Sequence, residues 1–316
     1  MVGSLGFRTA NRSAAVGVAL IVVAGVAMSC SNVPETPATR HPDNTPATES
    51  ERGWKADPRT ELLTGTIYLL AGESTSHLGV YRLQAPYDEL QAMGSESAVS
   101  SVAACPNFAA VAAPDPYADH IMRLTEDDLE SFQRIGKPRG SAPTLSRSCR
   151  LAFMEPIERE GTEAVKVRTW RPGSSTIRTM HTYREAGTLL AWGSERRLAI
   201  SRSQFPPYVI DIRNERRRLR SVRVGRGIRQ LNGLLWGPGN ALVATQTQPG
   251  RIIIVDIETG ARRRFDDWEA LAWRPDGRVL LVAQGSRLAI LNPRTGRVRV
   301  VGEISVGPVY DAAWTF

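Results

Sequence analysis

The most regular feature of the chain is a short apolar strand that ends in tryptophan and recurs along the C-terminal half. These strands lead into Trp192, Trp236, Trp273 and Trp314, which are 44, 37 and 41 residues apart. A turn rich in Gly, Pro and Asp and a second aliphatic strand follow most of them. A period near 40 residues built from short strands is typical of the blades of a β-propeller. The pattern therefore predicts an all-β propeller.

Each repeat has the same internal order of strands and turns. The third strand is aliphatic, as in residues 251–257 and 287–292. A turn that contains Thr259–Gly260 or Thr295–Gly296 then leads into an arginine-rich fourth strand. Proline fixes φ and glycine reaches positive φ, so turn geometry explains the proline and glycine residues of the turns in each repeat. The unit is thus predicted to be a four-stranded antiparallel blade.

Two weaker repeats and two half-repeats complete the pattern. The weak repeats occupy residues 102–111 and 144–154. Residues 65–70 resemble a second strand with no first strand before it, and residues 309–316 resemble a first strand with nothing after it. Pairing the two half-repeats would close the ring and remove a pair of open sheet edges. This predicts six blades over residues 59–316, closed by the C-terminal strand. Because the first repeats are weak, five or seven blades stay open.

The N-terminus has the pattern of an export signal. Arg8 and Arg12 precede an apolar run over residues 14–28. Basic residues followed by a short apolar run are typical of a secretory signal, whereas a transmembrane helix needs about 20 apolar residues. We therefore expect a signal peptide over residues 1–29. An uncleaved signal anchor is the alternative.

The small residues from Val26 to Cys30 resemble the lipobox of bacterial lipoproteins, with Ala27 where that family commonly has leucine. The resemblance implies cleavage before Cys30 and a diacylglyceryl and an acyl modification on that residue. It also implies a lipid anchor on the extracytoplasmic face of the cell membrane. Residues 30–58 are rich in Pro, Thr, Ser and acidic residues, a composition that does not fold, so we expect a disordered tether. No other cofactor is expected.

The charge balance is basic, with 40 Lys and Arg against 32 Asp and Glu and a formal net charge of +8. Lys55, Lys137 and Lys166 are the lysines, and arginine makes up the rest. Such a bias is expected of a GC-rich genome, for example an actinobacterial one. A basic surface favours anionic partners. With an export signal, those partners are anionic lipid or cell-envelope polymer and not nucleic acid.

The densest basic stretch falls on the predicted outer strand of the fourth blade. The candidate anion-binding stripe contains Arg213, Arg216, Arg217, Arg218, Arg220 and Arg223, and Arg226 and Arg229 extend it. Alternatively, these charges only protect an exposed strand edge from pairing with another chain. Arg262–Arg264 repeat the pattern one blade later, which favours this alternative.

Cys105 and Cys149 occupy nearly equivalent turns of neighbouring repeats. Because an exported protein folds in an oxidising compartment, we expect a disulfide between them. The repeated tryptophans are expected to pack between blades, and stacking on a flat ligand is the alternative.

Catalytic motifs are missing from the sequence: no nucleophile elbow, no zinc-protease motif and no Cys-x-x-Cys pair is present. Asp115, Asp119 and His120 form the one weak cluster of acid–base groups. The acidic run over residues 126–130 lacks the ligand spacing of a calcium loop. The sequence therefore predicts no catalytic residue and no metal site.

The stretch from Trp273 to Arg278 resembles the WD-repeat-like motif of the TolB C-terminal propeller, and this likeness extends over residues 140–316. The resemblance implies a non-catalytic module that docks a protein or an envelope component on one face of its ring. A propeller hydrolase or lyase, lactonase-like and with its site at the channel mouth, is the alternative. Several acids with a histidine at one end of the channel would favour the enzyme. An apolar face without buried acids would favour the binding module.

Overall fold

The computed structural model describes residues 54–57, 62–75, 77–94, 99–106, 108–113, 120–124, 132–159, 162–183, 189–194, 196–201, 209–214, 217–224, 231–237, 239, 241–246 and 250–315. All described residues belong to one compact unit, which lies within Pro46–Phe316. The predicted signal peptide and Cys30 lie outside the described residues. The part of the chain that the structure describes has no helix long and apolar enough to span a membrane.

The described strands form six antiparallel sheets, which we number 1 to 6. Sheet 1 consists of β25 (Val309–Thr315), β2 (Thr66–Ser74), β3 (His77–Gln84) and β4 (Leu90–Gly94). Sheet 2 consists of β5 (Ser101–Cys105), β6 (Phe108–Ala113), β7 (His120–Leu124) and β8 (Phe132–Arg139). Sheet 3 consists of β9 (Ser141–Leu145), β10 (Leu151–Arg159), β11 (Thr162–Trp170) and β12 (Arg178–Tyr183).

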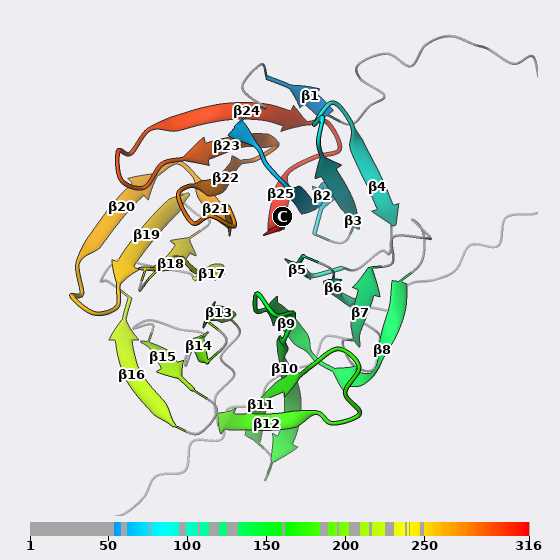
Figure 1. Ribbon diagram of the computed structural model, residues 1–316, viewed down its shortest axis with the longest axis vertical. Helices are drawn as coiled ribbons and strands as arrows, with labels where there is room; N and C mark the ends of the chain where they lie inside the picture. The colour runs from blue at the N-terminus through cyan, green and yellow to red at the C-terminus, as the bar shows by residue number, and fades with distance from the viewer. Residues whose placement is uncertain are drawn as a thin grey trace, which may run out of the picture. The chain divides into compact units, whose positions relative to one another are not determined.

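The remaining sheets come from the clear repeats of the sequence. Sheet 4 consists of β13 (Leu190–Ser194), β14 (Arg197–Ser201), β15 (Val209–Arg213) and β16 (Arg218–Arg223). Sheet 5 consists of β17 (Gly233–Trp236), β18 (Ala241–Gln246), β19 (Arg251–Asp256) and β20 (Arg262–Asp266). Sheet 6 consists of β21 (Glu269–Trp273), β22 (Leu280–Gln284), β23 (Arg287–Leu291), β24 (Val298–Ile304) and, outermost, β1 (Trp54–Ala56). Within this unit the sheets surround a central axis, and the first-named strand of sheets 1 to 5, with β21 of sheet 6, lies innermost (Figure 1). The fold is an all-β propeller.

The core lies between the sheets. Among the described residues, buried side chains form six hydrophobic clusters, and each cluster joins two neighbouring sheets. One cluster, for example, joins Ile252 of sheet 5 to Leu280 of sheet 6. Aliphatic side chains on both faces of a strand explain this arrangement, because each sheet has a neighbour on either side. The continuous apolar runs of the second and third strands follow from it.

The repeated tryptophans pack between sheets. The ring of Trp236 in sheet 5 lies against Gly193 of sheet 4, and the ring of Trp273 in sheet 6 lies against Gly237 of sheet 5. The indole nitrogen of Trp192 donates to the carbonyl of Thr144 in sheet 3, at 3.1 Å. The glycine after the tryptophan leaves room for the next ring, which explains the Trp–Gly pairs of the sequence. In these repeats the geometry matches the packing interpretation and not a stack on a ligand.

The first and the last half-repeat of the sequence meet in sheet 1. Strand β25 pairs with β2 over its length, with Trp314 opposite Ile67 and Thr315 opposite Thr66. The two half-repeats of the sequence therefore form one sheet, in which β25 and β2 pair the strand edges that each would otherwise leave open.

The predicted tether extends too far at its C-terminal end. Residues 54–56, within the range 30–58 predicted to be disordered, form β1 and pair with β24, with Trp54 opposite Ile304. Trp54 is 3% exposed and donates from its indole nitrogen to the carbonyl of Tyr87, at 3.0 Å. Composition averaged over the segment conceals this one aromatic residue, whose buried surface is enough to hold the strand.

Replacing Gly237 with alanine tests the packing of tryptophan on glycine. An added Cβ would lie 2.5 Å from Cε2 of Trp273, so the ring has to shift. We expect a loss of roughly 1–3 kcal/mol in the free energy of unfolding, measured by urea denaturation. Gly239→Asn is the control, because no atom lies within 4 Å of a Cβ at this positive-φ position (φ +63) and asparagine tolerates it. Equal losses in the two variants would contradict the packing argument.

Candidate functional site

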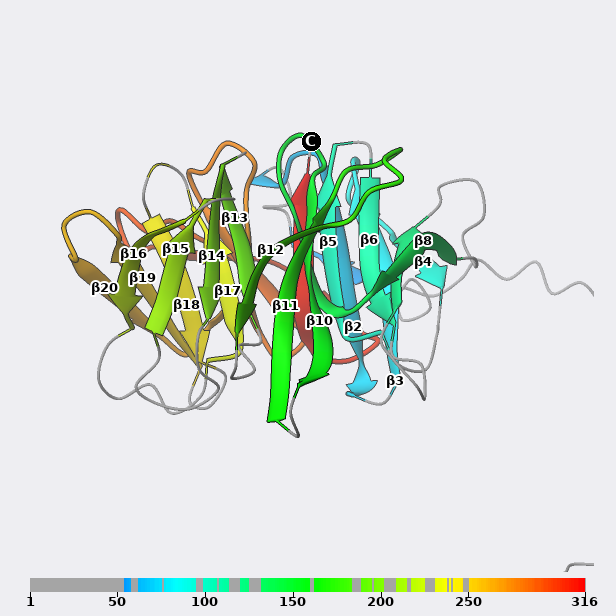
Figure 2. The ribbon, with the colours of Figure 1, turned by 90° about the horizontal axis from the view of Figure 1, so that it is seen from below.

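The strands run between two faces of the ring (Figure 2). One face carries the turns that follow the tryptophans and the turns between third and fourth strands, and we call it the turn face. On it, a cavity of about 910 Å³ lies between sheets 5 and 6. Trp273, Asp276 and Arg278 line it from sheet 6, and Asp256 and Arg263 line it from sheet 5. The turn face is therefore grooved at a joint between neighbouring sheets.

An arginine spans the ring on the turn face. Arg147, in the turn after β9 of sheet 3, donates from Nη2 to the carbonyl of Pro275 in the turn after β21 of sheet 6, at 3.0 Å. Sheets 3 and 6 stand on opposite sides of the axis in the order of the ring, and the turn after β9 approaches the axis in Figure 1. The hydrogen bond thus joins turns from opposite sides of the ring.

The predicted arginine stripe is divided by the structure. Arg217, Arg218, Arg220 and Arg223 are exposed on or beside the outer strand β16, and Arg216 lies outside the described residues. Arg213 is different: it is half-buried on β15, and its Nη2 lies 3.3 Å from Nδ1 of His181 in sheet 3. Arg213 belongs to a different strand from the exposed group and is half-buried, so the described members of the predicted stripe do not form one exposed row.

Some exposed arginines link neighbouring sheets. Arg220 of β16 donates to the carbonyl of Glu258 in the next sheet, at 3.1 Å. Arg263 of β20 donates to the carbonyls of Pro293 and Arg294 in the sheet after that, at 2.8 and 3.2 Å. Both occupy the same register, opposite Ile212 and Ile254 of their third strands. The fourth-strand arginines therefore have a structural role besides protecting a strand edge, and their recurrence at one position of the repeat was the sequence signal for it.

Two carboxyl groups with raised pKa values lie on the inner strands of neighbouring sheets. Burial raises the pKa of Glu269, the first residue of β21, to about 7. Burial also raises the pKa of Asp311 in β25 to about 7, although its carboxylate accepts hydrogen bonds from the backbone amides of Val102 and Ala312, both at 2.9 Å. The bond from Val102 ties the inner strand of sheet 2 to that of sheet 1. Sequence reasoning missed both residues; the signal for Asp311 was an aspartate in a strand of small apolar residues.

The other buried polar cluster lies between sheets 3 and 4. Asp211 is 2% exposed and accepts hydrogen bonds from the hydroxyls of Ser221, at 2.7 Å, and Tyr183, at 3.4 Å. The ring of His181 stands edge-on to that of Tyr183, with 4.6 Å between centroids. Burial, and then the charge of Arg213, lower the pKa of His181, while burial and the charge of Asp211 raise the pKa of Tyr183. This cluster lies on the third and fourth strands, away from Glu269 and Asp311.

The weak acid–base cluster of the sequence is not assembled by the described residues. Asp115, Asp119 and the acidic run at 126–130 lie outside them, and His120 is described only as the first residue of β7. Within the described ranges, no group of three or more His, Cys, Asp or Glu residues could hold a metal ion.

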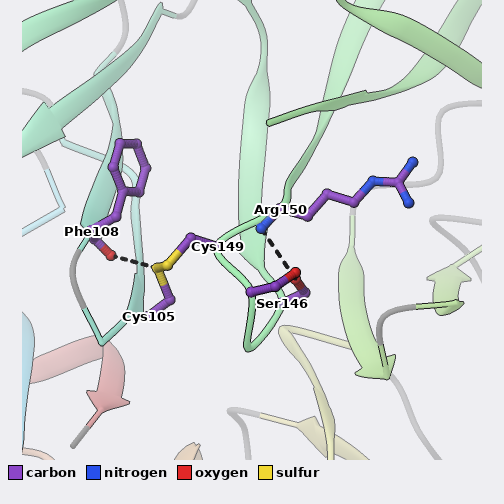
Figure 3. Close-up of a disulfide and its surroundings, with 6 residues drawn as sticks. Cys105, Phe108, Ser146, Cys149 and Arg150 are labelled. Atoms are coloured by element: carbon purple, nitrogen blue, oxygen red, sulfur yellow. Dashed lines mark hydrogen bonds between the residues drawn. A yellow bond between two sulfur atoms is a disulfide. The ribbon is translucent and has the colours of Figure 1, made fainter. Parts of the chain in front are cut away.

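Cys105 and Cys149 are joined by a disulfide (Figure 3). Cys105 ends β5 of sheet 2, and Cys149 lies in the turn after β9 of sheet 3, with 5.5 Å between the Cα atoms. The carbonyl oxygen of Phe108 lies 3.3 Å from Sγ of Cys105. The same turn carries Arg147, so the disulfide holds the segment from which Arg147 reaches the turn of sheet 6.

Comparisons with known proteins support the fold of the chain and no more specific property. No model of a protein family matches the chain, and no curated protein matches it in sequence. A putative TolB from Agrobacterium tumefaciens is similar in structure, with a TM-score of 0.53 and 11% identity over 79% of this chain and 98% of that one. A chain of the mitotic checkpoint complex has a TM-score of 0.50 and 17% identity over 78% of this chain and 83% of that one. An inactive variant of virginiamycin B lyase from Staphylococcus aureus, solved with quinupristin, has a TM-score of 0.48 and 12% identity over 78% of this chain and 87% of that one. At these identities the likeness supports the propeller fold alone.

Removal of the disulfide tests whether it stabilises the ring. The double variant Cys105→Ser, Cys149→Ser opens a link between residues 44 apart in sequence. We expect a loss of about 2–4 kcal/mol in the free energy of unfolding, because the unfolded chain gains freedom. Reduction of the native protein with dithiothreitol should give the same loss, and dithiothreitol should leave the double variant unchanged. A double variant as stable as the native protein would disprove the expected role.

The pH dependence of stability tests the environment of Glu269. Its folded pKa of about 7 lies above the usual value of 4.5, so the folded state binds the proton more tightly. The contribution of this tighter proton binding to the free energy of unfolding is complete below pH 4.5 and is lost as pH rises through 7. Glu269→Gln should therefore gain stability relative to the native protein between pH 5 and pH 8, as measured by urea denaturation at several pH values. A difference in stability between Glu269→Gln and the native protein that does not vary with pH would refute the assignment.

Proposed function

We propose that the chain is an extracytoplasmic lipoprotein whose six-bladed β-propeller is a non-catalytic binding module for a protein or an envelope component. The observation that carries the binding role is the grooved turn face, where a cavity of about 910 Å³ opens between sheets 5 and 6. The six sheets of the described residues support the blade count. The likeness to a chain of the mitotic checkpoint complex, a protein assembly, is consistent with a docking role.

The membrane anchor in this proposal rests on sequence. Cys30 would carry the diacylglyceryl and acyl groups, and the polar segment between Cys30 and Trp54 would be the tether. The tether then joins the propeller at β1, on the outer edge of sheet 6. The grooves beside sheet 6 would thus be the ones nearest to the point where the tether enters the domain.

A second candidate function, a lactonase-like hydrolase or lyase with its site at the channel mouth, is favoured by one observation. Glu269 and Asp311, on adjacent inner strands, both have pKa values of about 7, which suits proton transfer near neutral pH. Against it, Asp311 already accepts two backbone hydrogen bonds, and the described histidine side chains, His77 and His181, belong to β3 and β12. Hydrolysis of a lactone panel by the native protein, lost in Glu269→Gln, would establish this candidate.

The experiment for the proposed function compares the native protein with Cys30→Ala by crosslinking in cells and mass spectrometry. Ser31→Ala is the matched control, because it alters the neighbouring residue and keeps the cysteine. We expect the native protein and the control in the membrane fraction, with a lipid-bearing Cys30 and one recurrent protein or polymer partner. Cys30→Ala should lose the lipid and show less of that partner. Absence of a recurrent partner from all three proteins would overturn the binding role, and an unmodified Cys30 would overturn the anchor.

A further inference from the structure

The fourth strands of sheets 4, 5 and 6 carry an arginine at one shared register position. Arg220, Arg263 and Arg299 stand opposite Ile212, Ile254 and Ile290 of their third strands. The first two donate to turn carbonyls of the next sheet. Arg299 is exposed and, within the described part of the chain, makes no such bond.

The reason lies in the sheet that follows. Sheet 6 is followed by sheet 1, where the carbonyl of Tyr87, between β3 and β4, accepts the indole nitrogen of Trp54. Strand β1 therefore connects sheet 6 to sheet 1 at their periphery, as an arginine connects sheet 4 to sheet 5 and sheet 5 to sheet 6. The guanidinium of Arg299 is left available.

A pocket of about 280 Å³ lies beside this guanidinium on the turn face. Val279 and Ile290 are buried and supply an apolar floor, and Arg274, Arg297 and Arg299 stand around it. Arg274 is neutralised, because it makes two hydrogen bonds to the carboxylate of Asp276, at 2.9 and 2.7 Å. Arg297 is exposed and, like Arg299, has no ion pair among the described residues. Two uncompensated positive charges thus share one small pocket.

The equivalent groove one joint earlier differs in charge. There the turn begins with Asp256, whose Oδ1 accepts the amides of Glu258 and Thr259, at 2.9 and 2.7 Å. In the pocket of sheet 6 the same turn position is Asn292, whose Oδ1 accepts two amides in the same way, at 2.9 and 3.2 Å. The turn geometry is kept and the negative charge is removed. Asp256 and Asp276 line the earlier groove, whereas no carboxylate lines this pocket.

We propose that the pocket formed by Arg297, Arg299 and Asn292 binds a phosphate group. Paired guanidinium groups match the charge and the several oxygens of a phosphate, and each can donate two parallel hydrogen bonds. The small volume suits a head group, and the apolar floor suits a short carbon segment attached to it. The phosphate belongs either to a lipid head group or to a free small phosphate ester. This inference does not depend on the lipid anchor or on the scaffolding role.

Calorimetric titration of the purified full chain in a neutral detergent tests the proposal. The probes are inorganic phosphate, glycerol 1-phosphate as a monoester, and glycerophosphoglycerol as the diester of a lipid head group. We expect at least one probe to bind, with affinity that falls as salt rises. Preferred binding of the diester assigns the lipid source, and preferred binding of the monoester or of inorganic phosphate assigns a free ligand.

The variants locate the site. Arg297→Gln with Arg299→Gln should weaken binding at least tenfold, while the melting temperature stays close to that of the native protein because neither side chain is engaged. Arg220→Gln is the matched control: it removes an arginine at the same register of a different sheet, and it should keep the affinity although it loses the hydrogen bond to the carbonyl of Glu258. Failure of all three probes to bind, unchanged affinity in the double variant, or equal weakening in Arg220→Gln would each overturn the proposal.

Discussion

Burial of both faces of every sheet is the constraint on which the rest of this structure depends. Each four-stranded unit is apolar on its two sides, so a single unit cannot hide its surface from water. The six clusters of the described core show the solution, because each cluster is shared by two neighbouring sheets. A row of such sheets would expose an apolar face at each end unless it closed into a ring. The pairing of β25 with β2 provides that closure and joins the first and the last half-repeat of the sequence.

Hydrogen bonds and a disulfide also connect the sheets, at different distances from the central axis. Near the axis, Asp311 accepts the amide of Val102 across sheets 1 and 2. On the turn face, the Cys105–Cys149 disulfide joins sheets 2 and 3, and Arg147 of sheet 3 reaches Pro275 of sheet 6. At the periphery, fourth-strand arginines donate to turn carbonyls of the next sheet. The basic character of the chain is therefore partly architectural, because a guanidinium can satisfy several carbonyls at once.

The same architecture decides where a ligand could bind. Chemically capable groups are dispersed: Glu269 and Asp311 are on inner strands, and the cluster of His181, Tyr183 and Asp211 joins sheets 3 and 4. The cavities of the turn face lie between sheets, where two different surfaces meet. Repeated sheets give each interface between neighbours a similar geometry. A difference of one charge, such as Asn292 in sheet 6 where sheet 5 has Asp256, therefore makes the charge of one interface different from that of the next.

The sequence by itself determined the propeller, the strand order of its unit, the arginine-rich fourth strands and the pairing of the two half-repeats. These follow from local periodicity and turn residues, which act within a few positions of the chain. It also pointed to Cys105 and Cys149 as partners. Only the tertiary structure placed Trp54 in a sheet, separated Arg213 from the exposed arginines and left Arg299 without a turn to bind. It alone raised the pKa values of Glu269 and Asp311. Those outcomes depend on desolvation and on neighbours that are distant in sequence, and no local pattern records them.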